Sequence, residues 1–278
     1  MNRAVIKVGL SSLYAAPKQP EVVIDEGLYG MEAEILEEVG SFTKIRMEYG
    51  YEGYLLTEHL EKQGWPEGEK LRVLARQIDV MKEPKVDSIC LQTMPLGAVV
   101  LAAQGEALPA GWTAVQLLSG AIGYTKESFL APYKPLTFEP VCCESQEQEA
   151  WLRQCLTSAA MLYEQTTYRW GGKTPAGIDC SGLCSMAYML NGYAIYRDAQ
   201  IRDGYALREI PVNQVKSGDL LFFKGHVAMY LGEEERQYIH STAKAGSDGV
   251  DYNALSPQSP LYREDLANGI LAAGSLFV

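Results

Sequence analysis

Short stretches of alternating apolar and polar residues fill the first half of the chain. The pattern predicts strands at residues 7–13, 30–36, 42–47 and 50–55, separated by glycine and proline. Short strands divided by turn residues are typical of small antiparallel β domains. We therefore predict an all-β barrel over residues 1–63.

The same pattern returns after a break rich in glycine and proline at residues 64–68. Residues 97–101, 112–117 and 120–124 repeat the last three strands of the first barrel in the same order. Such internal similarity indicates a duplicated architecture. We predict a second barrel over residues 64–134, and the order of strands in both resembles the bacterial SH3-like module.

The two copies differ at one aromatic position. Tyr54 of the first copy recurs as Tyr124 of the second, whereas Tyr51 is matched by Ala121. The barrel itself therefore does not require an aromatic side chain at Tyr51.

Helical spacing begins in the second half of the chain. A proline-bearing linker at residues 131–144 ends at Ser145, which with Gln148 has the spacing of a capping box. A helix is expected from there toward Gln165, with an apolar inner face made of Leu152, Cys155, Leu156 and Ala159. We assign residues 135–278 to a third domain.

A second helix follows a glycine-rich loop that ends at Cys180. Apolar residues after it keep helical spacing, and Gly192 ends the helix; they are Leu183, Met186, Ala187 and Leu190. Cys180 thus falls in the first turn, where the helix dipole lowers the pKa of a thiol. A single cysteine at such a place is more often a packing residue than a nucleophile.

The histidines favour chemistry. The chain has three, and His226 and His240 lie on apparent strands downstream of Cys180. A hairpin that turns near Glu233 would bring them roughly opposite each other. Cys180, His226 and His240 would then be nucleophile, general base and the group that orients the base. His59 has no evident partner, and we expect it to be a packed or surface residue.

Four motifs in this order are similar to the NlpC family of bacterial cell-wall cysteine peptidases. They are Asp179-Cys180-Ser181-Gly182-Leu183, Gly218-Asp219-Leu220-Leu221-Phe222-Phe223, His226-Val227 and Ile239-His240-Ser241. The resemblance covers the chain from about Ser145 onward. It implies an α+β, papain-like catalytic domain that follows the two SH3-like barrels, and peptidoglycan stem peptides as substrates.

The resemblance also implies substrate contacts. In related peptidases with such barrels, the residues that match Asp179 and Ser181 hold the free amine of an N-terminal L-Ala, and a tyrosine at the place of Tyr51 reaches the active site. Further cleft residues implied by the resemblance are Trp170, Tyr168, Arg197 and Asp198. Core packing of the two aromatic residues and a solvated or structural ion pair of Arg197 with Asp198 are the alternatives.

Asp179 favours a cationic substrate by its charge alone, because a carboxylate beside the thiol raises the thiol pKa unless a cation neutralises it. The implied reaction is hydrolysis of L-Ala-γ-D-Glu-L-diamino acid peptides between D-Glu and the diamino acid. Such γ-D-glutamyl-L-diamino acid endopeptidases act in murein peptide recycling.

Charge restricts the partners. The net charge is -11 without a lysine or arginine cluster, which argues against nucleic acid and anionic membrane surfaces. No secretory signal is visible, so we expect a cytoplasmic monomer acting on a small peptide, or an extracytoplasmic one if a signal has been removed. The six cysteines indicate free thiols, and no cofactor or metal is expected.

Two other functions remain open from sequence. A secreted autolysin would use the SH3-like barrels to bind the wall, and should carry a signal peptide and a basic surface. An acyltransferase or amidase of the same superfamily would keep the cysteine and histidine without the Asp-Cys-Ser context.

Overall fold

The computed structural model describes residues 2–104, 108–232 and 237–278. The chain divides into two compact units, Met1–Tyr133 and Lys134–Val278. Each unit is described by itself below.

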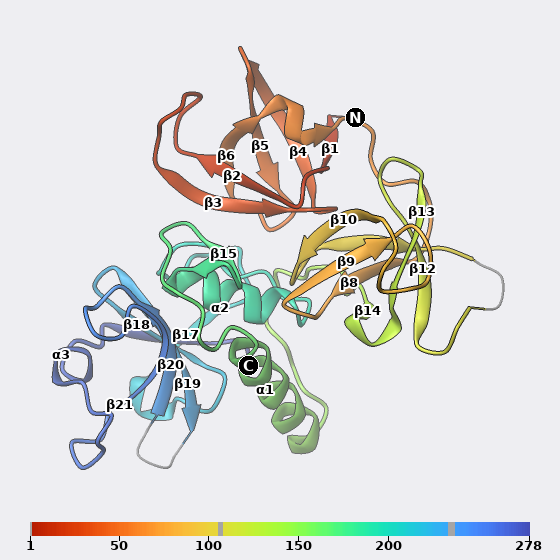
Figure 1. Ribbon diagram of the computed structural model, residues 1–278. Coiled ribbons are helices and arrows are strands. Elements are labelled where there is room, and N and C mark those ends of the chain that lie inside the picture. Colours follow the sequence, from red (N-terminus) through yellow and green to blue (C-terminus); the bar gives the residue numbers. More distant parts are fainter. Residues whose placement is uncertain (1, 105–107, 233–236) are drawn as a thin grey trace. The chain divides into compact units, whose positions relative to one another are not determined.

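The first unit holds two seven-stranded antiparallel sheets with the same strand order (Figure 1). The first sheet is ordered β3-β2-β6-β5-β4-β1-β7 and the second β10-β9-β13-β12-β11-β8-β14. Adding seven to each number of the first order gives the second, so the repeat extends to the whole topology. The first sheet contains β1 (Arg3–Ile6), β2 (Leu10–Tyr14), β3 (Val23–Leu28), β4 (Glu32–Val39), β5 (Phe42–Met47), β6 (Glu52–Leu56) and β7 (Leu60–Glu61). The second contains β8 (Lys70–Val73), β9 (Gln77–Met81), β10 (Cys90–Pro95), β11 (Val99–Ala102), β12 (Trp112–Gln116), β13 (Ile122–Lys126) and β14 (Leu130–Pro132).

Matching glycines hold matching turns in the two sheets. Gly50 and Gly120 have φ of 82° and 80°, which a side chain would strain. Of the strand expected at residues 7–13, only residues 10–13 are extended, in β2, because the chain bends at Val8 and Gly9. Several strands were not predicted, namely β1, β3 and β7 of the first sheet and β8, β9, β10 and β14 of the second.

The two sheets share a core. Tyr29 is buried among the apolar residues of the second sheet, and its hydroxyl accepts from the backbone N–H of Leu118 at 2.7 Å. The Trp65 indole donates to the carbonyl of Gly30 at 2.8 Å. The first unit is therefore packed as one body.

The second unit is an α+β domain with a six-stranded sheet ordered β17-β22-β18-β19-β20-β21. Helices α1 and α2 lie beside each other, and both pack against β19 (Figure 1). The strands are β17 (Arg208–Ile210), β22 (Ala272–Ser275), β18 (Leu220–Phe223), β19 (His226–Gly232), β20 (Gln237–Thr242) and β21 (Gly249–Ala254); a two-stranded hairpin is made by β15 (Lys173–Thr174) and β16 (Gly177–Ile178). The helices are α1 (Gln146–Met161), α2 (Cys180–Met189) and the short α3 (Glu264–Ala267).

Helix α1 begins as predicted and ends early. The Ser145 hydroxyl accepts from the N–H of Gln148 at 3.2 Å, and the Gln148 side chain accepts from the N–H of Glu144 rather than Ser145. The helix stops at Met161, before Gln165, whose φ of 62° is left-handed. In the described residues, no helix combines the length and apolarity needed to cross a membrane.

Candidate active site

The loop before α2 packs so tightly against the first turn of α2 that only glycine fits at one position in each. A Cβ on Gly172 would lie 2.4 Å from the carbonyl oxygen of Gly177, and one on Gly182 would lie 2.2 Å from that of Gly172. The hairpin of β15 and β16 therefore closes directly onto the first turn of α2. This packing fixes where Cys180 begins the helix.

Cys180 is buried, with 7% of its surface exposed. Burial raises the pKa of its thiol to about 11, and the neighbouring Asp179 carboxylate adds to the rise. The backbone N–H groups of Val227 and Ser181 and the charge of Arg197 oppose it with smaller effects. The net shift of this pKa is upward, because desolvation of the thiolate outweighs the lowering expected from the start of the helix.

His226 and His240 meet from neighbouring strands. Nε2 of His226 lies 2.7 Å from Nδ1 of His240. The register pairs Met229 with Ile239 and Tyr230 with Tyr238, so the two histidines are diagonal across β19 and β20 rather than directly opposite. The turn expected near Glu233 lies outside the described residues.

A third side chain extends this row and was missed from the sequence. Nε2 of His240 lies 2.9 Å from Oδ1 of Asn253 on β21. An asparagine in a strand carries no catalytic signature by itself. Its only signal would have been a strand pairing of residues 249–254 beside His240, which the pattern did not reveal.

Both imidazoles are held neutral. Burial and the neighbouring His240 lower the pKa of His226 to about 3, and burial lowers that of His240 to about 4 although Asn253 opposes the shift. At neutral pH each ring therefore has one N–H and one accepting nitrogen.

The contact with His240 leaves one nitrogen of His226 for the thiol. Val227, the neighbour of His226 on β19, donates its backbone N–H to the Cys180 sulfur. Because Nε2 of His226 contacts His240, Nδ1 is the nitrogen left to take the thiol proton. The first N–H groups of α2 have no acceptor within the helix, so that of Cys180 is suited to stabilise an oxyanion.

Arg197 occupies an unexpected place. It is 2% exposed and forms a two-pronged ion pair with Asp179, at 3.0 Å to Oδ1 and 3.1 Å to Oδ2. It also donates to the hydroxyl of Ser181 at 2.8 Å. The sequence predicts an Asp179 carboxylate that lacks a cation until substrate arrives, and this was wrong, because Arg197 supplies a buried cation.

Asp179 has structural duties as well. Its carboxylate accepts from the N–H of Gly182 at 2.6 Å, which caps α2, and from the N–H of Gly171 at 2.8 Å. The Ser181 hydroxyl donates to it at 3.3 Å. With Arg197, the two oxygens accept five hydrogen bonds, so the carboxylate is held rigidly beside the nucleophile.

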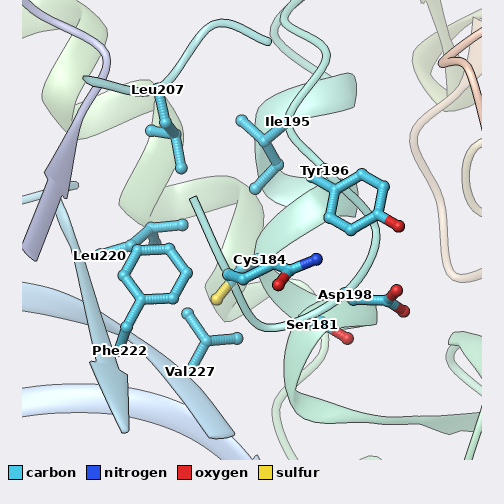
Figure 2. Close-up of a pocket in the computed structure, with 10 residues that line it drawn as sticks. Ser181, Cys184, Ile195, Tyr196, Asp198, Leu207, Leu220, Phe222 and Val227 are labelled. Carbon is cyan, nitrogen blue, oxygen red and sulfur yellow. The ribbon is translucent and has the colours of Figure 1, made fainter. Parts of the chain in front are cut away.

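A small pocket opens next to Ser181 and Val227, the neighbours of the catalytic pair (Figure 2). Its cavity of about 10 Å³ holds roughly one water. Figure 2 shows Leu220 and Phe222 on one side of the pocket, with Ser181 and Asp198 on the other. Asp198, expected at the cleft, thus lies at a pocket that is apolar at one wall and polar at the other.

The aromatic candidates differ in exposure. The backbone of Tyr168 forms an isolated β-bridge with that of Ile178. Burial, and to a smaller extent the charges of Cys180 and Asp179, raise the pKa of the Tyr168 hydroxyl to about 12. Trp170 is 65% exposed, so it is not a core residue. Tyr51 belongs to the first unit, and its contact with substrate stays a prediction.

The cysteines and possible metal ligands of the described residues were also located. All six cysteines are free thiols. Within the described ranges, no group of three or more histidine, cysteine and carboxylate side chains is arranged to hold a metal ion.

A thiol at the start of a helix, a neutral imidazole on the adjacent strand and a second imidazole behind it define a papain-like cysteine peptidase. Comparison with protein families matches residues 165–264 to the NlpC/P60 family. Over 284 aligned positions that cover both chains completely, the chain is 41% identical to dipeptidyl-peptidase 6 of Lysinibacillus sphaericus. The chain belongs to the NlpC/P60 family, and it is a cysteine peptidase.

Two further comparisons complete the picture. The chain is 39% identical over 88 residues, 28% of its length and 29% of the relative's, to the gamma-D-glutamyl-L-lysine dipeptidyl-peptidase of Bacillus subtilis strain 168. A crystal structure of an NlpC/P60 family protein from Bacillus cereus superposes with a TM-score of 0.74 over 98% of each chain at 18% identity. The predicted fold class, two all-β domains followed by an α+β catalytic domain, is confirmed.

Proposed function

We propose that the protein cleaves free murein peptides that begin with L-Ala, at the bond between γ-D-Glu and an L-diamino acid. The observation that carries this proposal is the full-length similarity to a protein named dipeptidyl-peptidase 6. The name of the Bacillus subtilis relative, which specifies a γ-D-glutamyl-L-lysine bond, supports the same cleavage point. A dipeptidyl product requires that the enzyme measure two residues from a free N-terminus.

Chemistry follows from the row of side chains. His226 Nδ1 takes the proton of Cys180 as the sulfur attacks the γ-carbonyl carbon of D-Glu, and the N–H of Cys180 stabilises the oxyanion. The imidazolium of His226 then gives its proton to the amine of the diamino acid, which leaves. Water, deprotonated by His226, attacks the thioester and releases L-Ala-D-Glu.

We assign binding of the substrate's free N-terminal amine to Asp179 and Ser181, as the family resemblance implies. The ion pair with Arg197 lowers the expected discrimination between free and N-acetylated peptides. With Arg197 in place, an acetylated peptide would not leave Asp179 as an isolated buried charge. What such a peptide loses is about one charge-assisted hydrogen bond. We therefore expect a discrimination of roughly tenfold or somewhat more in kcat/KM.

The test is product analysis by mass spectrometry. Purified enzyme is given L-Ala-γ-D-Glu-L-Lys and L-Ala-γ-D-Glu-meso-diaminopimelate, each free and N-acetylated, together with intact sacculi. We expect release of L-Ala-D-Glu from the free peptides and slower release of N-acetyl-L-Ala-D-Glu from the acetylated ones. Almost no product should be released from sacculi. Equal kcat/KM on free and acetylated peptides would contradict the proposal and favour an autolysin.

A cytoplasmic role in peptide recycling is part of the proposal. It is supported by the net charge of -11, which suits a small soluble substrate better than an anionic wall polymer. Fractionation of the producing cells, with activity on L-Ala-γ-D-Glu-L-Lys assayed in cytoplasm and medium, tests the location. Activity confined to the medium would overturn this part.

A further inference from the structure

Asn253 joins the active-site histidines to a backbone carbonyl. Its Nδ2 lies 3.2 Å from the carbonyl oxygen of Leu261, while its Oδ1 lies 2.9 Å from Nε2 of His240. The Leu261 carbonyl also accepts from the N–H of Ala254 at 2.9 Å, which holds it in place. A carbonyl oxygen can only accept, so the amide of Asn253 must turn its NH₂ toward Leu261 and its oxygen toward His240.

The direction of the amide determines every proton in the row. Because Oδ1 of Asn253 only accepts, Nε2 of His240 must carry the hydrogen, and Nδ1 of the neutral ring must accept. The partner of that Nδ1, Nε2 of His226, must then donate across the 2.7 Å contact. This leaves Nδ1 of His226 without a hydrogen and free to take the proton of Cys180.

We propose that Asn253 is a positioning residue that fixes the tautomer of His240 and, through it, the tautomer of His226 that can act as a base. The proposal concerns the cysteine peptidase chemistry itself and does not depend on which peptide is cleaved. It assigns to an uncharged amide the role at the end of the row, behind the two imidazoles.

A neutral imidazole needs such a device. Its two tautomers are close in energy, and the wrong one would present N–H to the thiol and could not accept a proton. His240 has no exposed surface, so solvent does not select its tautomer. The lowered pKa values of both rings agree with neutral imidazoles. The other charged groups that influence these pKa values are Arg263, Asp265 and, for His240, Asp251.

The alternative is that Asn253 only ties β21 to the segment around Leu261. Asn253→Asp separates the two roles. The aspartate keeps an acceptor for Nε2–H of His240 but loses the donor to the Leu261 carbonyl. The link between β21 and Leu261 would therefore be lost, whereas the tautomer of His240 would be retained. Asn253→Ala removes both.

The direct measurement is nitrogen NMR of protein labelled with ¹⁵N-histidine at neutral pH. The chain has only three histidines, and His59, which contacts the Ser11 hydroxyl through Nδ1, serves as an internal reference. We expect His226 and His240 both to be Nε2–H tautomers in the wild type and in Asn253→Asp. In Asn253→Ala their signals should move toward tautomer mixtures while those of His59 stay unchanged.

Kinetics give an independent readout. In Asn253→Ala, kcat should fall roughly 10- to 100-fold with KM unchanged, since only the proton acceptor is lost. Inactivation by iodoacetamide, which needs the thiolate but no substrate, should slow in the same variant. Asn253→Asp should recover most of both rates, despite a lower melting temperature.

Asn191→Ala is the matched control, because the Asn191 amide also donates to backbone carbonyls, those of Cys155 and Ala187, in the same unit. It should lower the melting temperature and leave the histidine signals and both rates unchanged. An Nδ1–H tautomer of His240 in the wild type would overturn the proposal. So would full rates in Asn253→Ala, or equal losses of rate in Asn253→Ala and Asn253→Asp.

Discussion

Cys180 lies in surroundings that favour the uncharged thiol, so its reactivity depends on transfer of its proton to His226. We expect Cys180→Ala and His226→Ala to lose all measurable hydrolysis while the protein still folds. His240→Gln should retain part of the activity, because an amide can also orient an imidazole, whereas His240→Ala should retain much less. Steady-state rates on L-Ala-γ-D-Glu-L-Lys, with circular dichroism as a check of folding, test this. Hydrolysis by Cys180→Ala, or equal rates in the two His240 variants, would contradict the assigned roles.

The buried histidines make the stability of the enzyme depend on pH. Their pKa values of about 3 and about 4 lie below the ordinary 6.5, so between these values the unfolded chain binds protons that the folded chain does not. The free energy of unfolding should therefore fall as the pH falls through this window, by at most roughly 1.4 kcal/mol per pH unit for each histidine. Urea denaturation between pH about 4.5 and 7 measures it.

The comparison variant is His226→Gln, which removes one titrating ring and should show a shallower slope. His59 remains in both proteins, so its contribution cancels. Identical slopes would mean that His226 is not buried as a neutral ring.

For single residues, the sequence predicted which side chains are catalytic better than it predicted their burial and their partners. Cys180, His226 and His240 could be found because their types and order are distinctive. The pairing of Arg197 with Asp179 could not, since these residues are far apart in sequence and Asp198 is an equally plausible partner for Arg197 by proximity alone. The sign of the thiol pKa shift depends on burial, which the residue types around Cys180 do not specify.

The elements around the nucleophile leave no room for a side chain at Gly182. Alanine normally favours a helix over glycine by about 1 kcal/mol, yet in Gly182→Ala the new Cβ would lie 2.2 Å from the Gly172 carbonyl oxygen and 2.9 Å from Asp179 Oδ1. We expect destabilisation by about 1 to 3 kcal/mol and a marked loss of kcat, because β15, β16 and the start of α2 must move apart. Thermal unfolding and steady-state rates measure these effects.

Gly64→Ala is the control for this change. Nothing lies within 4 Å of the Cβ it would add. It should change neither the melting temperature nor kcat by much. A Gly182→Ala protein as stable and active as the wild type would show that the loop can relax.

Strands and helices were predicted unevenly. Strand β5, Phe42–Met47, and the start of α2 at Cys180 coincide with the expected bounds, because alternation and helical spacing are clear there. Strand β3 was missed because it contains Asp25 and Glu26. These buried acidic residues interrupt the apolar alternation on which the prediction rests. Helix α1 ends at Met161, short of the predicted Gln165, which is left-handed, and the sequence carries no signal for either feature.

At the scale of the whole molecule, the repeat separates what the β domains need from what the enzyme needs. Tyr51 has no aromatic counterpart in the second copy, so we expect Tyr51→Phe to raise KM for L-Ala-γ-D-Glu-L-Lys severalfold with little change in kcat. Tyr54→Phe, at a position shared with Tyr124, is the control and should leave KM unchanged. Equal KM values in wild type and Tyr51→Phe would remove Tyr51 from the substrate site.

The position of β22 in the sheet has a consequence for how the enzyme is made. This strand, Ala272–Ser275, follows all other strands along the chain, yet it lies between β17 and β18. On a ribosome, the first unit can be complete while the catalytic sheet still lacks an interior strand. At ordinary rates of synthesis that interval is on the order of ten seconds. A nascent chain therefore carries its nucleophile before it carries a complete catalytic sheet, which can form only once residue 275 has emerged.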